Sequence, residues 1–179
     1  AGEYDRDSDY SISMFISGSN TGTDNQLILT KATSSITPQY PFRIELSGSN
    51  QIEFSAQGSP TYRSMITSSA DVSSSWTHIV CQKTGSSIQM YVDGALHASE
   101  TNELFNNNNH PLSASSRIDN LQNLSIGGYG VANSNLQGQL DEIRIYNMPY
   151  RPNGDAVSPR PFACVIRLSG SRHTVRCRR

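Results

Sequence analysis

The hydrophobic pattern of this chain is that of many short β-strands joined by polar turns. Apolar residues recur in short alternating groups, and a period of two puts successive side chains on opposite faces of a strand. The clearest case is the stretch 76–97, where Ile79 and Cys81 alternate with more polar residues. Asp93 and Gly94 tolerate the positive φ angles that a two-residue turn requires. The pattern therefore predicts a three-stranded meander.

The same alternation predicts strands along the rest of the chain. Phe42, Ile44 and Leu46 fall on one face of a strand, which turns at 47–50 into the next one. Further strands are expected at 51–55 and 62–67. We therefore expect an all-β protein.

Several of these segments form motifs in a fixed order. A Trp-Thr-His-Ile segment at 76–79 leads into a Tyr-Val-Asp-Gly hairpin at 91–94, and the run Leu-Gln-Gly-Gln-Leu-Asp-Glu-Ile-Arg-Ile-Tyr-Asn follows at 136–147. With the opening strands at 10–16 and 26–31, this order resembles a laminin-G-like domain of the concanavalin A-like class. The resemblance implies an antiparallel β-sandwich of the jelly-roll type over residues 3–150, in which Trp76 is a core residue.

Composition agrees with a single soluble sandwich. The chain has 179 residues, of which 35% are hydrophobic and 16% charged, and this length is enough to bury a core without disulfides or metals. No apolar run approaches the roughly eighteen residues needed to cross a bilayer. The first residues do not form a basic-then-apolar leader. We expect no membrane insertion.

Charge divides the chain into an acidic body and a basic tail. Residues 1–150 hold seven Lys or Arg against fourteen Asp or Glu, a net charge of −7, whereas 151–179 hold seven Arg against Asp155 alone, a net charge of +6. We therefore expect a jelly-roll domain at 1–150 and a separate tail at 151–179. Nucleic acid is not an expected partner, because the tail has one aromatic residue, Phe162, and no lysine. We expect the tail to contact an acidic surface, its own or a neighbour's.

The tail itself is predicted to end in a short hairpin. The sequence 164–177 is symmetric about Gly170 and Ser171, so that a turn there places Cys164 opposite Cys177. Directly opposed residues of an antiparallel pair come close enough for a disulfide. We expect this bridge, which implies an oxidising compartment, and we expect Cys81 to be a buried free thiol.

Two interpretations of the acidic residues near the first strand are open. Asp5, Asp7 and Asp9 precede that strand, and Asp141 lies in the closing strand, which in several jelly-roll sandwiches helps to bind a structural Ca²⁺. Alternatively the N-terminal carboxylates are solvated charges, and a carboxylate of the closing strand pairs with Arg144.

The expected ligand-binding residues lie on one strand face and in two polar loops. Residues 100–123 form a long, carbonyl-rich segment with little periodicity, and loops of this length in a compact domain are often functional. Their amide side chains both donate and accept hydrogen bonds, as sugar hydroxyls require. The same amides also simply form turns. The candidates are His78, Tyr91 and Asp93 on the strand face, Asn106, Asn107, Asn108 and Asn109 in the long loop, and Tyr129 in the second loop.

The sequence contains no recognised catalytic arrangement. Glucanases of the concanavalin A-like class need carboxylates at alternate positions of one strand, whereas Asp141 and Glu142 are adjacent and are expected to face opposite ways. The four His residues are scattered, and no His or Cys spacing suits a metal site. We expect a protein that is not an enzyme.

Two functional hypotheses follow. The first is a recognition or adhesion module at an extracellular, cell, virion or filament surface, which binds a glycan or a surface protein. The alternative is a structural subunit of a decoration, fibre or filament, in which residues 151–179 contact the next copy. Fold alone does not decide between them.

Overall fold

The computed structural model describes residues 9–31, 41–56, 64–85, 87–101, 123–128, 135–146 and 148–152, together with the backbone of 57–59, 62–63, 163–169 and 172–178. Every regular element in these residues is a β-strand, as the alternating pattern predicts. No helix long and apolar enough for a membrane span occurs in the described part. The strands are β1 (Tyr10–Gly18), β2 (Gln26–Thr30), β3 (Arg43–Leu46), β4 (Gln51–Ser59), β5 (Tyr62–Asp71), β6 (Thr77–Thr84), β7 (Ser87–Val92), β8 (Ala95–Thr101), β9 (Ser125–Ile126), β10 (Gly138–Tyr146), β11 (Ala163–Ser169) and β12 (Arg172–Arg178).

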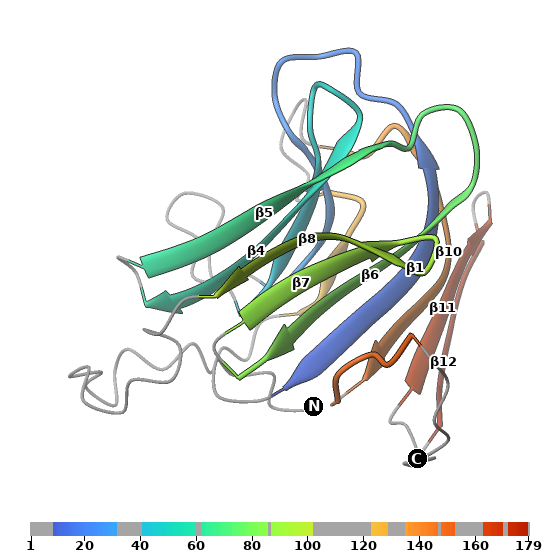
Figure 1. Cartoon of the computed structure of the whole chain (residues 1–179). Coiled ribbons are helices and arrows are strands. Elements are labelled where there is room, and N and C mark those ends of the chain that lie inside the picture. The colour runs from blue at the N-terminus through green and yellow to red at the C-terminus, as the bar shows by residue number, and fades with distance from the viewer. Residues whose placement is uncertain are drawn as a thin grey trace.

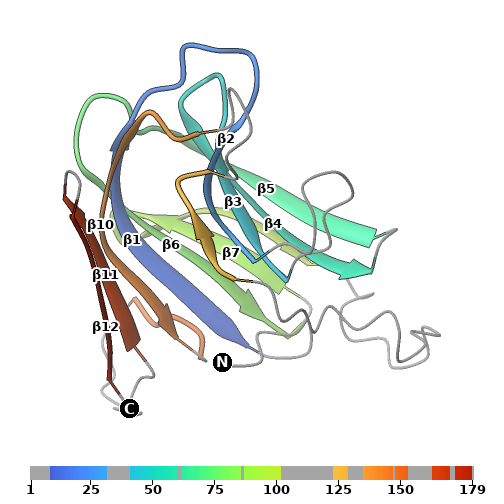
Figure 2. The same ribbon diagram turned by 180° about the vertical axis from the view of Figure 1, so that it is seen from behind.

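The strands form two antiparallel sheets that pack as a sandwich. One sheet has seven strands in the order β12-β11-β10-β1-β6-β7-β8, and the other has five in the order β5-β4-β3-β2-β9. Figure 1 shows the two layers with the β11–β12 hairpin at the end of the seven-stranded sheet. The view from behind shows β2 and β3 side by side in the five-stranded sheet (Figure 2), where they lie between β4 and β9. The predicted all-β jelly-roll sandwich is confirmed.

The core lies between the sheets and follows from the period of two. Inward positions of β1, β3, β7 and β10 carry apolar side chains, and burying one such side chain stabilises the fold by about 1.5–3 kcal/mol. Phe42, Ile44 and Leu46 are all buried on one face of β3 and its approach, as predicted. The other large buried members include Tyr10, Ile12, Met14, Ile16, Ile28, Phe54, Ile79, Met90 and Ile143.

The meander predicted at 76–97 is present as β6, β7 and β8. Ile79 pairs with Val92 and Cys81 with Met90, so that one face of the hairpin enters the core. Asp93 and Gly94 both have positive φ angles, 48° and 84°, which a tight turn of this kind requires. The turn chemistry of the sequence therefore fixes the register of these strands.

The C-terminal hairpin extends the seven-stranded sheet beyond β10. Ile166 of β11 pairs with Ile143 of β10. Within the hairpin, Cys164 pairs with Cys177, which is the register that the sequence symmetry predicts. The side chains of this hairpin lie outside the described residues, so the disulfide stays a prediction. Cys81 is a buried free thiol, as predicted, and burial raises its pKa.

Candidate functional site

The structure corrects the prediction that Trp76 is a core residue. Its side chain is 48% exposed. Val72, at the other end of the same connection, is the residue that enters the core. Thr77 is buried and pairs with Ile16, so alternation puts Trp76 on the solvent side of the sheet. The side chain that sequence reasoning assigned to packing is therefore available to a ligand.

A second exposed aromatic side chain lies on the outer face of the same sheet. Phe15 of β1 is 39% exposed, and it pairs with His78 of β6. The two rings are 4.9 Å apart between centroids and tilted by 39°. Trp76 precedes β6 and lies one residue beyond the Ile16–Thr77 pair, two residues along the chain from His78, which pairs with Phe15.

Polar side chains complete this part of the sheet. His78 Nε2 is 2.9 Å from the hydroxyl of Ser13, and Arg144 forms an ion pair with Glu142 with an N–O distance of 2.5 Å. Ser13 pairs with Arg144 across β1 and β10. We refer to Ser13, Phe15, Trp76, His78, Glu142 and Arg144 as the outer-face cluster.

The surroundings of His78 favour the neutral form of its imidazole. Partial burial lowers the pKa of His78 below its usual value, and the positive charge of Arg144 lowers it further, whereas Asp93 acts in the opposite direction. A neutral imidazole has one donor and one acceptor nitrogen. His78 can thus exchange hydrogen bonds with a hydroxyl-rich ligand at neutral pH.

A β-bulge in β10 leaves the carboxylates of Asp141 and Glu142 both outside the core. Leu140 and Ile143 both enter the core although they are three residues apart, and the pairing with β1 shifts between Ser13 and Phe15. Glu142 takes up the extra residue with a φ of 49°. The expectation that Asp141 and Glu142 face opposite ways was wrong, because the bulge leaves both outside the core. The alternative that a carboxylate of this strand pairs with Arg144 is confirmed.

The loop that carries Trp76 is held at its base by backbone hydrogen bonds. The Val72 N–H donates to the Asn50 carbonyl at 3.0 Å, and the Val72 carbonyl accepts from Gly18 N–H at 3.3 Å. Hydrogen bonds from the Ser73 side chain and from the Ser73 N–H lower the pKa of Asp71, and the N–H donates to the carboxylate at 2.8 Å. This end of the loop is therefore fixed against two neighbouring segments, at Asn50 and at Gly18.

The segment 148–152, which we call the strap, covers the part of the same sheet face that carries Ser11, Gln82 and Tyr91. The hydroxyl of Ser11 donates to the Met148 carbonyl at 2.7 Å, and the Tyr150 N–H donates to the Gln82 side-chain oxygen at 2.6 Å. The ring of Tyr150 packs edge-on against Tyr91 at 5.3 Å. Tyr91 is only 9% exposed, so this predicted ligand residue packs beneath the strap.

Asp93 is held by hydrogen bonds to the backbone of His78. Its carboxylate accepts a hydrogen bond from the His78 N–H at 2.9 Å, and its own N–H donates to the His78 carbonyl at 2.8 Å. Of the three predicted strand-face candidates, the structure therefore brings His78 into the outer-face cluster and places Asp93 beside it.

The structure describes only some of the other predicted site residues. Asn106, Asn107, Asn108, Asn109 and Tyr129 lie outside the described residues, and so do Asp5 and Asp7. Asp9 accepts a hydrogen bond from Gly85 N–H at 2.8 Å, whereas Asp141 pairs with Phe15, about 20 Å further along β1 at 3.4 Å per residue. One ion cannot bridge Asp9 and Asp141, and no metal-binding group of three residues occurs among those described.

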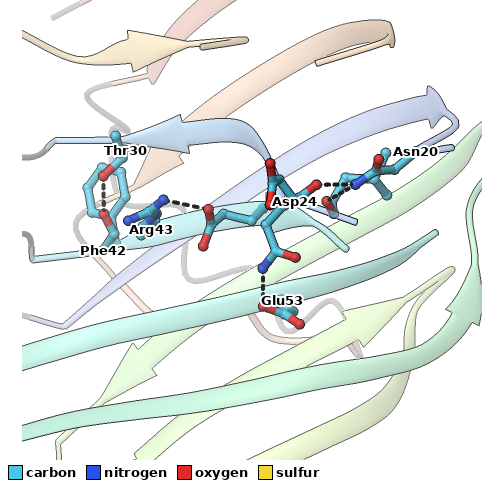
Figure 3. Close-up of polar contacts among 9 residues, drawn as sticks. Asn20, Asp24, Thr30, Phe42, Arg43 and Glu53 are labelled. Carbon is cyan, nitrogen blue, oxygen red and sulfur yellow. Dashed lines mark hydrogen bonds and ion pairs between the residues drawn. The ribbon is translucent and has the colours of Figure 1, made fainter. Parts of the chain in front are cut away.

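The outer face of the five-stranded sheet contains a pair of carboxylates that the sequence did not reveal. Glu45 and Glu53 are directly opposed on β3 and β4. Glu45 forms an ion pair with Arg43 at 2.6 Å, and Glu53 accepts a hydrogen bond from Asn25 at 2.7 Å. Figure 3 shows these contacts around Arg43 and Glu53. The pair escaped the search for catalytic spacing because it crosses two strands.

The chain was then compared with known families. Residues 2–153 match the laminin G model described as the concanavalin A-like lectin/glucanases superfamily. The chain belongs to this superfamily. A comparison with curated protein sequences finds no match.

Solved structures of this superfamily's fold include several binding domains. The binding domain of Paraclostridial Mosquitocidal Protein 1 aligns with a TM-score of 0.62 and 18% identity over 84% of this chain. The chain spans 36% of that protein chain. The Ruminococcus gnavus IT-sialidase CBM40 bound to α2,3-sialyllactose gives a TM-score of 0.62 and 11% identity, with 82% of this chain and 79% of that one covered.

A third similar structure is laminin itself. Domains LG4-5 of the mouse laminin α1 chain align with a TM-score of 0.54 and 14% identity, over 80% of this chain and 36% of that one. At such identities the similarity establishes the fold alone.

Part of the outer-face cluster has a sequence signal that was overlooked. Phe15 occupies the polar phase of β1, in line with Ser11, Ser13 and Ser17, whereas Tyr10, Ile12, Met14 and Ile16 form the core phase. An aromatic residue in a row of serines marks an exposed ring. The sequence gives no such signal for Arg144, because the pairing of β10 with β1 that brings Arg144 beside Ser13 is known only from the fold.

Proposed function

We propose that this domain is a non-enzymatic glycan-recognition module and that its outer-face cluster binds the sugar. The observation that supports this is the exposure of two large aromatic side chains, Phe15 and Trp76, on one sheet face beside polar side chains. Exposed aromatic surface next to polar groups is typical of an interaction site. The proposed location is extracellular or at a particle surface.

The chemistry of this face suits a pyranose ring. The C–H face of a sugar is apolar and packs on an aromatic ring, while the hydroxyls at its edge need both donors and acceptors. Phe15 and Trp76 supply the rings. His78 and Ser13 supply hydrogen-bonding groups that accept or donate, and Arg144 supplies a donor held in place by Glu142.

Three features favour binding over hydrolysis. Asp141 and Glu142 are neighbours at a bulge rather than alternate residues of a strand, and Glu142 is ion-paired. The opposed pair Glu45 and Glu53 lies on the other sheet, away from the exposed rings. A hydrolase would need an acid and a second carboxylate flanking the bound sugar.

A glycan-binding screen followed by calorimetry tests this function. We expect Trp76→Ala and Phe15→Ala each to weaken binding of the best glycan by about tenfold, since a ring contact of about 1–1.5 kcal/mol is lost. Met65→Ala is the matched control, because Met65 is 43% exposed on the other sheet. The glycan should be recovered intact.

Two results would contradict the proposal. Equal affinity of the Trp76→Ala, Phe15→Ala and Met65→Ala variants would show that the sugar binds elsewhere. Release of shorter sugars, abolished by Glu45→Gln or Glu53→Gln, would show a hydrolase instead.

A structural subunit is the second candidate, and one observation favours it. β12 ends the seven-stranded sheet, and no described strand pairs with its outer edge. A strand edge of this kind can pair with another chain, although charged residues on it oppose such pairing. Sedimentation of the chain with and without 163–179 tests this candidate: concentration-dependent assembly lost on deletion would support it, and a monomer at all concentrations would exclude it.

A further inference from the structure

The register of the C-terminal hairpin places its arginines on the face that carries the outer-face cluster. Directly paired residues share a face of a sheet. Ile166 pairs with Ile143, which belongs to the core, so positions 164, 166 and 168 of β11 fall on the core side. Positions 163, 165, 167 and 169 of β11 fall on the outer side, together with the residues of β12 that pair with them. The arginines among these positions are Arg167, Arg172, Arg176 and Arg178.

These four positions continue the face of β10 that contains Arg144. Arg144 follows Ile143, so the extrapolated register puts it level with Val165, and Val165 pairs with Arg176. Neighbouring strands are about 4.8 Å apart, so β12 lies about 10 Å from β10 and roughly 19 Å from β6, which carries His78. An oligosaccharide of a few residues is long enough to span this distance.

The charge on this part of the face is strongly positive. β10, β11 and β12 together place five arginines on the outer side against two carboxylates, Asp141 and Glu142. Residues 1–150 carry a net charge of −7 and 151–179 one of +6. Five of the fourteen Lys and Arg residues of the chain therefore lie at positions on one end of the same surface that exposes Phe15 and Trp76.

We propose that the ligand is an acidic oligosaccharide, in which sugar rings contact Phe15 and Trp76 and carboxylate or sulfate groups are bound by the arginines of the hairpin. This inference rests on the proposed function. Guanidinium groups suit such anions because they donate two parallel hydrogen bonds to two oxygens. All seven cationic residues of the tail are arginines and none is a lysine, which agrees with recognition by this geometry.

The test uses pairs of glycans that differ only in charge. Sialylated, uronic-acid and sulfated oligosaccharides are compared with their desialylated, carboxyl-reduced and desulfated counterparts on the whole chain. We expect the acidic member of a pair to bind at least tenfold more tightly, and raised salt to reduce this difference.

Two arginines are then neutralised together. Arg172→Gln with Arg176→Gln should weaken binding of the acidic glycan by about tenfold, since hydrogen bonds to a charged group are lost, and should leave the neutral counterpart unchanged. The matching lysine double variant should recover only part of the affinity, because it restores charge without the planar fork. Arg63→Gln in β5 is the control, since it removes a positive charge from the other sheet.

The outcomes separate this inference from the proposed function. Equal binding of acidic and neutral glycans, unaffected by the arginine variants, would overturn the acidic ligand and leave glycan recognition standing. Binding of neither kind would overturn the proposed function itself. Tighter binding of single-stranded RNA or anionic vesicles than of any acidic glycan, lost in the same double variant, would also overturn the inference.

Discussion

Removing the contact between the strap at 148–152 and Tyr91 tests whether Tyr91 is a packed residue beneath the strap or a ligand-binding residue that the strap covers. Replacing Tyr150 by Ala removes its edge-on contact with Tyr91, a pair worth about 0.5–1.5 kcal/mol beyond area. It also uncovers roughly 40 Å² of the Tyr91 ring, about 1 kcal/mol at 25 cal/mol per Å². The free energy of unfolding should fall by about 2 kcal/mol in total.

The assay is thermal and urea unfolding followed by circular dichroism. A loss of about 2 kcal/mol lowers Tm by roughly 4–8 °C in a domain of this size. Tyr150→Phe keeps the ring and should unfold like the parent chain. Gln82→Leu, which removes the acceptor of the Tyr150 N–H, should also destabilise the protein. All three variants should bind glycan as the parent does.

This prediction is refuted by a particular pattern of results. If Tyr150→Ala leaves Tm unchanged and instead strengthens glycan binding, the strap is a cover over a binding residue, and Tyr91 acts as the sequence predicted. Loss of glycan binding in Tyr150→Ala with normal stability would mean that the strap itself contacts the ligand.

Two further predictions concern the hairpin and the histidine. Reduction of the expected Cys164–Cys177 bridge, which closes a loop of about 14 residues, should destabilise the hairpin by about 3 kcal/mol; mass mapping that finds both thiols free before reduction would exclude the bridge. The pKa of His78 lies below its usual 6.5, so the unfolded chain takes up this proton first and stability falls as pH drops below about 6.5. An NMR titration of His78 that gives a pKa above 6.5 would contradict this.

The sequence was informative wherever a local rule decided the structure. Alternation located the core residues of β3 and β6, and the Asp93-Gly94 pair located a turn whose positive φ angles only such residues adopt easily. The symmetry of 164–177 gave the hairpin register. Each of these depends on neighbours within a few residues.

The candidate site depended on contacts that the sequence does not display. The family resemblance assigned Trp76 to the core, whereas its side chain is exposed and Val72 is the core residue of this connection. The burial of Tyr91 follows from a strap about 60 residues away. The bulge at Glu142 changed the faces of two carboxylates with a single extra residue. Tertiary packing decided the burial of Tyr91 and the bulge decided the faces of the two carboxylates, so alternation alone could not predict either.

Fluorescence of Trp76 tests the central claim most directly, because it is the single tryptophan of the chain. In the free protein its half-exposed ring should be readily quenched by acrylamide. On titration with a bound glycan, the account predicts a shift of emission to shorter wavelength and protection from acrylamide, with the same midpoint as calorimetry. Glycan binding that leaves both the emission and the quenching of Trp76 unchanged would contradict it.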